Sequence, residues 1–308
     1  MTRLVDSLVR ATGLSERDIL RIIANAPVRY KHYTIKKRTG GRRPIAHPAR
    51  ELKVLQRAVV DHYLKLLPIH QAATAYRKGV SIKHNALAHA ANGPIMKMDF
   101  KDFFTSIKSH DWYLYCDDRG LFSDGIERHQ VTQILFHRAP RVTGLRLAIG
   151  APSSPILSNV MMYQFDAILS EILAQDYVTY TRYADDLTFS AKRTGYLTVV
   201  ERAVAEALRR VEWPQLSINK KKTVVATTKY HRQVTGLVLT NDGDVSIGRD
   251  RKRRLRAAVH RALNQKVEED WLNSLKGMLA FVQGVEPEFI RRLSHYYGVD
   301  VLRDLGER

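Results

Sequence analysis

Two adjacent carboxylates stand out, because Asp185 and Asp186 interrupt a stretch that otherwise consists of sheet-forming residues. The flanks, YVTYTRY before the pair and LTFSA after it, are rich in β-branched and aromatic side chains. They predict two short strands with the pair at a tight hairpin turn. Neighbouring negative charges repel each other, and Arg182 alone is a poor candidate for neutralising both. The pair therefore indicates a cation site, unless it is an ordinary solvated turn, where Asp is common.

The chain contains an internal comparison for this pair. Asp117 and Asp118 form the same dipeptide within LYCDDRGLF. Their surroundings predict a helix followed by Gly120, with no strand on the far side. We expect this second pair to have no catalytic role.

A third carboxylate favours the cation site over the solvated turn. Asp99 ends the apolar stretch PIMKMD, which predicts a strand, and the aromatic segment FKDFF follows it. Three carboxylates from a strand end and a neighbouring hairpin turn can hold two Mg²⁺ ions about 4 Å apart. Such a pair of ions activates an attacking hydroxyl and stabilises a leaving pyrophosphate, which is the chemistry of nucleotidyl transfer.

The charge balance indicates a polyanionic partner. The 308 residues include 50 Lys and Arg against 31 Asp and Glu, a net charge of +19. Each phosphate that such a surface neutralises releases condensed counterions, so nucleic acid is the expected partner. A membrane surface would attract the same charge, but no apolar stretch approaches the ~18 residues that span a bilayer.

Two further features favour a cytoplasmic location. The N-terminal sequence MTRLVDSLVRATG is charged and lacks the apolar core of a secretory signal. The single cysteine, Cys116, excludes an internal disulfide and a thiolate metal cluster.

Helices and antiparallel hairpins alternate along the chain without a βαβα rhythm, which predicts the α+β class. Apolar residues at helical spacing predict two short helices within residues 3–25, joined at Gly13, and another helix that stops at Pro68. Between them, a Gly-Gly turn dense in Lys and Arg predicts a basic hairpin. We expect mostly helix over residues 109–146, a further helix at about 197–211, short strands after it, and helices from Arg251 onward.

Four motifs resemble those of reverse transcriptases and occur in that family's order. They are MDFKDFF with Asp99, GAPSSP at residues 150–155, YADD with Asp185 and Asp186, and LSINKKKT at residues 216–223 with Lys222. One such motif is weak evidence, but four in order over about residues 30–240 are strong.

Two more matches narrow the resemblance to bacterial retron reverse transcriptases. NALAH, residues 85–89, fits their Asn-Ala-x-x-His element, and VTG, residues 234–236, fits their second diagnostic triplet. The length agrees as well, since group II intron proteins carry added maturase and often endonuclease segments.

The resemblance implies roles for the residues in these motifs. Asp99, Asp185 and Asp186 would hold Mg²⁺, with the Phe100 carbonyl oxygen as an extra ligand. Phe104 would stack under the deoxyribose and exclude a 2′-hydroxyl, unless it only packs in the core. Core packing is what we expect of its neighbour Phe103. The other nucleotide-binding residues would be Arg43, with Lys37 and Arg42 as rivals, together with Ser153, Ser154, Pro155 and Lys222.

The chain departs from the resemblance at one position. Many relatives have Gln immediately before the glycine of the GAPSSP loop, where this chain has Ile149. An amide that could touch the incoming sugar is missing, so nucleotide affinity or selectivity would be set differently.

For the partner RNA, the resemblance implies a recognition role for Asn85, His89, Thr235 and Gly236. Without it, Asn85 and His89 would indicate a helix surface with a satisfied histidine, and Val-Thr-Gly a strand with a bulge. In RDRKRRLRAAVHRAL, residues 249–263, six of the first eight residues are basic, which exceeds what solubility requires. Those expected to grip the template and primer are Arg251, Lys252, Arg253 and Arg254.

The resemblance implies a right-hand polymerase fold with three lobes. N-terminal helices and fingers would cover residues 1–93, and a helical thumb residues 241–308. The palm would cover residues 94–240, with an inserted helical fingers segment at about 113–146.

The implied activity is RNA-directed DNA synthesis from dNTPs, with two Mg²⁺ ions as cofactor. The template would be a partner noncoding RNA, the msr–msd transcript, primed from a guanosine 2′-hydroxyl. The product would be branched msDNA that stays bound, and the biological role defence against phage with a separately encoded effector protein. The alternatives are a reverse transcriptase of another bacterial lineage, such as a group II intron-like enzyme, or a scaffold that holds RNA and an effector.

Overall fold

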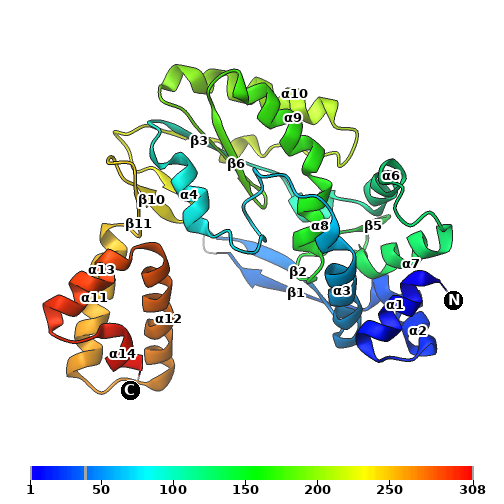
Figure 1. Cartoon of the computed structure of the whole chain (residues 1–308), viewed down its shortest axis with the longest axis horizontal. Helices are drawn as coiled ribbons and strands as arrows, with labels where there is room; N and C mark the ends of the chain where they lie inside the picture. Colours follow the sequence, from blue (N-terminus) through cyan, green and yellow to red (C-terminus); the bar gives the residue numbers. More distant parts are fainter. Residues whose placement is uncertain (1, 38–39, 307–308) are drawn as a thin grey trace. The chain divides into compact units, whose positions relative to one another are not determined.

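The computed structural model describes residues 2–37 and 40–306, which form two compact units (Figure 1). Unit 1 contains residues 2–37, 40–79, 97–189 and 198–224, and unit 2 contains residues 80–96, 190–197 and 225–306. Both units combine helices with antiparallel strands, so the predicted α+β class is confirmed. The three lobes with the limits given above stay a prediction.

Unit 1 begins with the two predicted helices, α1 (Arg3–Thr12) and α2 (Glu16–Asn25). Gly13 ends the first one with a φ of +70°, a left-handed conformation that glycine adopts without steric cost. The basic hairpin follows as β1 (Tyr30–Lys36) and β2 (Arg42–Pro48), paired antiparallel. Helix α3 (Arg50–His62) then packs against α1 and α2.

The segment at residues 109–146 is helical only in its first part. Helices α6 (Ser109–Arg119) and α7 (Gly125–Leu135) are followed by a small hairpin of β4 (His137–Arg138) and β5 (Leu145–Arg146). The prediction of mostly helix is therefore wrong for residues 137–146. Pro140 and Gly144 lie between these strands, and both disfavour a helix.

A four-stranded sheet in the order β6-β7-β3-β8 carries the predicted carboxylates. Its strands are β3 (Ile95–Asp99), β6 (Thr179–Tyr183), β7 (Asp186–Ser190) and β8 (Val224–Ala226). Two hydrogen bonds mark the ends of the β3 and β7 pair. At one end the Gly93 N–H donates to the Ala191 carbonyl, at 3.0 Å. At the other end the Phe100 N–H donates to the Asp185 carbonyl, at 3.1 Å. These bonds make β3 and β7 antiparallel, as the alternation of hairpins predicts.

Three helices of unit 1 follow the GAPSSP loop and the sheet hairpin. They are α8 (Ser154–Met161), α9 (Tyr163–Ala174) and α10 (Val200–Arg210), and α9 packs against both β6 and α10. The shorter helices of the chain are α5 (Phe103–Ser106) and the 3₁₀ turns Ala26–Val28, Leu64–Leu66, Thr194–Val199 and Lys220–Lys222.

A fully buried arginine connects the sheet of unit 1 to these helices. Arg182 on β6 forms an ion pair with Asp166 of α9, with 2.6 Å between Nη2 and Oδ2, and neither side chain has exposed surface. Its Nη1 donates to Asn159 Oδ1 of α8 at 3.0 Å and to the Ala184 carbonyl at 3.2 Å. Its own N–H donates to the Ala72 carbonyl, at 2.7 Å. One side chain and its backbone thus fix two helices, a loop and the β6–β7 turn.

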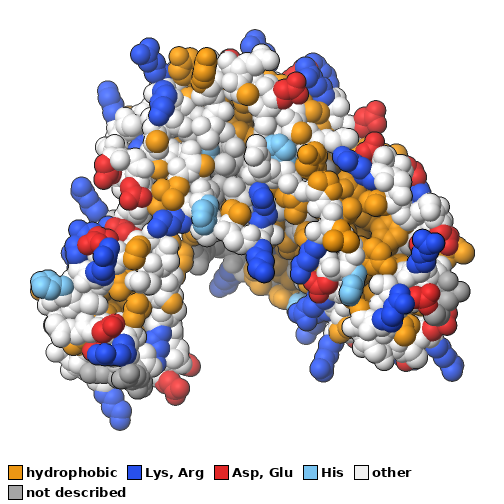
Figure 2. All heavy atoms as spheres, in the orientation of Figure 1, with side chains coloured by type: hydrophobic (Ala, Val, Ile, Leu, Met, Phe, Trp, Pro, Cys, Tyr) orange, Lys and Arg blue, Asp and Glu red, His pale blue; other side chains and the backbone are white. Residues whose placement is uncertain are grey.

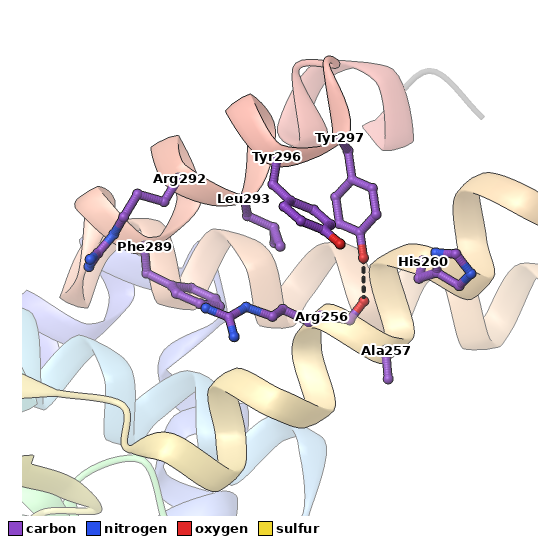
Figure 3. A pocket seen from close by; sticks show the side chains of 8 residues that line it. All are labelled: Arg256, Ala257, His260, Phe289, Arg292, Leu293, Tyr296 and Tyr297. Atoms are coloured by element: carbon purple, nitrogen blue, oxygen red, sulfur yellow. Dashed lines mark hydrogen bonds between the residues drawn. The ribbon is translucent and has the colours of Figure 1, made fainter.

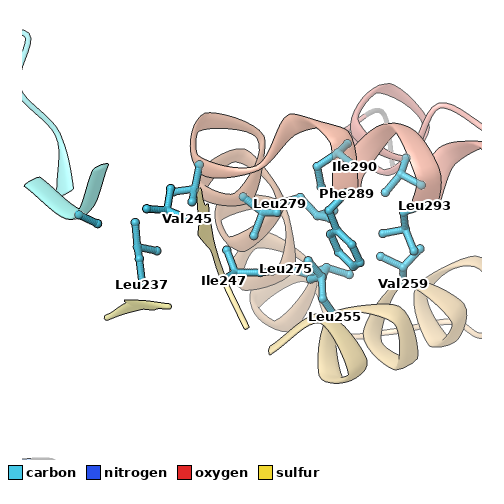
Figure 4. Packing of buried hydrophobic residues seen from close by; sticks show 14 of the residues in the cluster. Leu237, Val245, Ile247, Leu255, Val259, Leu275, Leu279, Phe289, Ile290 and Leu293 are labelled. Carbon is cyan, nitrogen blue, oxygen red and sulfur yellow. The ribbon is translucent and has the colours of Figure 1, made fainter. Parts of the chain in front are cut away.

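Unit 2 pairs a small sheet with five helices. The strands are β9 (Gln233–Val234), β10 (Leu237–Leu239) and β11 (Val245–Ser246), and the helices are α4 (Ile82–Ala90), α11 (Arg249–Asn264), α12 (Glu269–Val285), α13 (Pro287–Tyr297) and α14 (Val301–Gly306). Figure 4 shows its core, in which Leu255 of α11, Leu279 of α12 and Phe289 of α13 point toward one another. The predicted C-terminal helices are confirmed. Among the described residues, no helix is long and apolar enough to cross a membrane.

We expect Arg182→Met to lower the free energy of unfolding by about 3–5 kcal/mol, because it leaves the Asp166 carboxylate buried without its partner. Urea denaturation followed by circular dichroism measures the change. Arg209→Met is the control, since the Arg209 side chain is 76% exposed in its pair with Glu206 and should change stability by less than about 1 kcal/mol. Equal stability of the two variants would contradict the assigned role of Arg182.

Candidate active site

The adjacent carboxylates lie at the turn that the sequence predicts. Strand β6 ends at Tyr183 and β7 begins at Asp186, so Ala184 and Asp185 form a two-residue turn. Ala184 has a φ of +58°, and Asp185 is not among the residues with positive φ, which is the φ pattern of a type II′ turn. Arg182 binds Asp166 instead of these carboxylates, so it supports their backbone without neutralising them.

Asp99 is brought next to this turn by backbone hydrogen bonds. Phe100 donates its N–H to the Asp185 carbonyl, at 3.1 Å, directly after β3 ends at Asp99. On the other side of β3, the Asn219 N–H donates to the Asp99 carbonyl at 2.8 Å. The Lys222 ammonium then lies 2.9 Å from each oxygen of the Asp99 carboxylate. The structure thus brings together residues from three of the four motifs.

The carboxylates of the turn hold negative charge at an energetic cost. Burial, together with the neighbouring Asp185 charge, raises the pKa of Asp186 to about 6, although Lys97 and Lys222 oppose the shift. Burial also raises the pKa of Asp185, with Asp99 adding to the effect and Lys222 and Arg43 opposing it. The cluster is short of positive charge, and a bound cation would stabilise it.

The donor atoms suit Mg²⁺ in kind, because carboxylate oxygens are the hard ligands that this ion takes. Within residues 2–37 and 40–306, however, no three Asp, Glu, His or Cys side chains are gathered closely enough to hold a metal ion. Asp99 instead pairs with Lys222. A cation held by all three carboxylates would compete with Lys222 for the Asp99 oxygens.

A pocket of about 390 Å³ in unit 1 contains many of the predicted nucleotide-binding residues. Arg43 of β2 and Phe104 of α5 both line it, while Phe103 is 3% exposed and stacks on Phe100. Core packing by Phe103 is thus confirmed. Among the rival cations, Arg42 donates to Thr34, and neither Arg42 nor Lys37 lines the pocket.

The GAPSSP loop lies against strand β2. A Cβ on Gly150 would be 2.9 Å from the Ala46 carbonyl oxygen, and Gly150 has a φ of +123°, so only glycine fits. The Ile149 carbonyl accepts a hydrogen bond from the Ala46 N–H at 2.9 Å, and the Ile149 side chain belongs to the pocket lining, together with Ser154 and Pro155. Ser153 does not line the pocket and has no exposed surface.

Several pocket residues were not predicted from the sequence. Lys53 and Arg57 of α3 line the pocket together with Arg43 and His47, and within residues 2–37 and 40–306 no Asp or Glu does so. Their i, i+4 spacing on a helix directly after the basic hairpin was a signal that could have identified them. Tyr76 also lines the pocket, with a φ of +58°, but no sequence signal marks a non-glycine residue for that conformation.

The NALAH and VTG elements, far apart in sequence, meet in unit 2. Thr235 and Gly236 form a two-residue turn between β9 and β10 with φ values of +46° and +82°, the pattern of a type I′ turn. The alternative reading as a bulged strand is therefore wrong. Thr235 Oγ1 donates to the Ile82 carbonyl at 3.2 Å, and α4 packs on β10.

Asn85 and His89 lie inside unit 2, so their reading as a helix surface is wrong. Neither has exposed surface, and His89 Nδ1 is 2.7 Å from Ser190 Oγ. Their side chains are therefore not available for direct contact with RNA in this conformation.

The basic run forms the first half of α11. Lys252 pairs with Glu286, and Arg253 pairs with Asp250 at 3.4 Å. Arg251 lies 5.8 Å from the ring centre of Phe281, while Arg254 is exposed. By contrast, the comparison pair lies in α6, the helix that the sequence predicts. Asp117 pairs with Arg128, Asp118 lies 3.2 Å from Arg119, and their side chains are 60% and 49% exposed.

Comparisons with known proteins agree with these observations. Residues 35–239 match the family described as reverse transcriptase (RNA-dependent DNA polymerase). The retron Ec83 reverse transcriptase of Escherichia coli is 34% identical over 278 residues, covering 90% of this chain and 89% of that protein. The retron Mx162 reverse transcriptase of Myxococcus xanthus is 35% identical, covering 92% of this chain and 64% of that protein. A telomerase structure from Candida albicans matches with a TM-score of 0.46 and 12% identity, covering 90% of this chain and 59% of that one.

The buried histidine of α4 should make stability depend on pH. Burial lowers the pKa of His89 from 6.5 to about 4, so the folded protein keeps it neutral where the unfolded chain binds a proton. Stability should fall as the pH drops from about 6.5 toward 4, by about 2 kcal/mol between pH 7 and pH 5. Urea unfolding at both pH values measures this loss. His89→Gln should show a smaller loss, and equal losses would contradict the burial of a neutral His89.

Proposed function

The chain belongs to the retron reverse transcriptases, which are RNA-directed DNA polymerases, and from this premise we propose that it copies a partner noncoding RNA into branched msDNA. Synthesis starts from the 2′-hydroxyl of a guanosine in the msr–msd transcript, uses dNTPs, and leaves the product bound to the protein. The observation that carries the proposal is the hydrogen bond from Phe100 to Asp185, which ties the strand end of Asp99 to the turn of Asp185 and Asp186.

We assign the three carboxylates to the binding of two Mg²⁺ ions, with the Phe100 carbonyl oxygen as a further ligand. Reverse transcriptases generally depend on divalent metal, which lowers the pKa of the attacking hydroxyl and neutralises charge on the phosphates. The raised pKa values of Asp185 and Asp186 support the assignment, because these carboxylates gain most from a cation. Lys222, which balances Asp99 in this structure, is then free to face the triphosphate.

The pocket beside the carboxylates receives the incoming nucleotide. Arg43, with Lys53 and Arg57 beside it, supplies positive charge for the triphosphate. The Phe104 ring stacks under the deoxyribose and leaves no room for a 2′-hydroxyl. Ser154 and Pro155 shape the loop wall, and Ser153 supports it from inside. Because Ile149 offers no amide to the sugar, we expect selectivity to depend more heavily on Phe104.

Recognition of the partner RNA uses unit 2. We assign the NALAH and VTG elements to it jointly, because the bond from Thr235 to Ile82 joins them. Buried Asn85 and His89 act indirectly by holding α4, whereas the Thr235–Gly236 turn is partly exposed and can contact RNA. The first half of α11, with Arg251, Lys252, Arg253 and Arg254, adds phosphate contacts. Figure 2 shows Lys and Arg side chains projecting from the surface of both units.

The proposed setting is a cytoplasmic defence against phage, in which a separately encoded effector protein binds the complex of enzyme and msDNA. The proposal also assigns three lobes to the chain. The fingers cover residues 1–93, the palm covers residues 94–240 with an inserted segment at about 113–146, and the thumb covers residues 241–308. Membership in the retron family supports these assignments.

Asp185→Asn and Asp186→Asn should each lower DNA synthesis by about 100-fold or more, because an amide cannot replace a carboxylate that binds metal. Two assays measure the loss: primer extension on a generic RNA template, and production of RNA-linked DNA when the chain is expressed with its partner RNA. The matched controls, Asp117→Asn and Asp118→Asn, should keep most activity in both assays. If the wild-type protein extends the primer but produces no RNA-linked DNA, only the msDNA part of the proposal is refuted.

Phe104→Ala should admit ribonucleotides, because removing the ring removes the clash with the 2′-hydroxyl. We expect the preference for dNTP over rNTP to fall by about tenfold or more, measured as the ratio of incorporation rates in single-nucleotide extension. Phe103→Ala is the control, since its ring packs in the core and should affect stability without changing the ratio. An unchanged ratio in Phe104→Ala would rule out this ring as the steric gate.

A further inference from the structure

A second pocket, of about 660 Å³, lies between α11 and α13 in unit 2 (Figure 3). Arg256, Ala257 and His260 line it from α11, and Phe289, Arg292, Leu293, Tyr296 and Tyr297 line it from α13. None of these residues belongs to the carboxylate site, the nucleotide pocket or the NALAH and VTG elements. The volume falls within the ~300–1,000 Å³ that is usual for pockets that bind small molecules.

One end of this pocket presents an open aromatic ring on a fixed support. Tyr296 is 78% exposed, and its ring meets the Tyr297 ring edge to face, with 4.9 Å between centroids. Tyr297 is held in turn, because its hydroxyl donates to the Arg256 carbonyl at 3.2 Å (Figure 3). The small side chain of Ala257 leaves space between the helices. A flat apolar group can therefore lie on Tyr296 without moving the core.

The same pocket contains positive charge that the protein does not neutralise. Within the described part of the chain, neither Arg256 nor Arg292 forms an ion pair, although the adjacent Arg291 pairs with Glu288 at 2.5 Å. The Arg256 guanidinium lies 5.7 Å from the ring centre of Phe289, which orients it. Among the residues that the structure describes, no Asp or Glu lines the pocket. An occupant that is both flat and anionic fits this combination.

We propose that the pocket binds one unpaired nucleotide of the RNA that the enzyme carries, with the base on Tyr296 and its phosphate between Arg256 and Arg292. The proposal rests on the proposed function, because it names a subsite for that RNA. A paired base is already stacked within its helix, so only an unpaired nucleotide offers a free face to the ring. An acidic peptide could use the two arginines, but it would leave the aromatic ring without a partner.

Photo-crosslinking with the full chain tests this assignment. The probe is a ten-nucleotide single-stranded RNA with one 4-thiouridine, and the crosslinked peptide is identified by mass spectrometry. We expect crosslinks in α13 at Tyr296 or Tyr297. Ala257→Phe, which fills the pocket, and Tyr296→Ala should each reduce this crosslink about tenfold. The same probe in a blunt RNA duplex should crosslink weakly there.

Two controls make the result specific. Tyr230→Ala removes another exposed tyrosine of unit 2, 73% exposed and outside the pocket, and should leave the crosslink unchanged. Tyr296→Phe keeps the ring and should retain binding. The melting temperatures of the Tyr296→Ala and Tyr296→Phe variants should be close to that of the wild type, because the exposed Tyr296 is not needed for folding.

Two outcomes would overturn the proposal. One is the absence of a crosslink in α13, or a crosslink there that Ala257→Phe leaves unchanged. The other is displacement of the probe by a poly-glutamate peptide but not by unlabelled single-stranded RNA, which would assign the pocket to an acidic protein partner. Primer extension with the same preparations separates the pocket hypothesis from the proposed polymerase function. If the protein extends the primer but shows no crosslink in α13, the pocket hypothesis is refuted and the polymerase function stands.

Discussion

A buried guanidinium holds the candidate active site in place. Arg182 has no exposed surface, and it binds Asp166 of α9, Asn159 of α8 and the Ala184 carbonyl. An ion buried without partners costs several kcal/mol, so each partner is constrained to its position. Because Ala184 immediately precedes Asp185, a charge that does not touch the carboxylates fixes their backbone. The backbone of Arg182 also pairs with residues 72–74, which lead to Tyr76 in the nucleotide pocket.

The carboxylate site and the nucleotide pocket have opposite electrostatic characters. Burial and mutual repulsion raise the pKa values of Asp185 and Asp186, whereas the pocket contains only cations among its charged lining residues. Under the proposed function a nucleotide triphosphate with bound metal would match both, because the cations would balance its phosphates and the carboxylates would hold its metal. Arg43 links the two regions, since it lines the pocket and lowers the pKa of Asp185.

Unit 2 buries some of the residues that we propose for RNA recognition and exposes others. Asn85 and His89 are buried, while the Thr235–Gly236 turn and the basic side chains of α11 reach the surface. Thr235 is β-branched, and its φ of +46° is strained for such a residue. Its bond to Ile82 stabilises that conformation. If the turn contacts RNA as proposed, a substitution in NALAH would change RNA binding by moving the turn, without removing a direct contact.

The sequence by itself determined the chemistry and most of the local structure. Alternating β-formers around Asp185 and Asp186 predicted the hairpin, because a strand pair with a two-residue turn is a local feature. The order of the four motifs predicted the family, which the comparisons confirm. The helical pattern around Asp117 and Asp118 also predicted correctly that this second pair lies in a helix.

Tertiary structure decided what depends on residues far apart in the chain. Burial of Asn85 and His89 follows from packing of α4 on strands about 150 residues later, and helical periodicity alone does not say which polar residues such packing encloses. Lys53, Arg57 and Tyr76 join the pocket because α3 and residue 76 are brought beside the GAPSSP loop. The pairing of Arg182 with Asp166 and of Lys222 with Asp99 was likewise invisible, since an ion pair is set by distance in space.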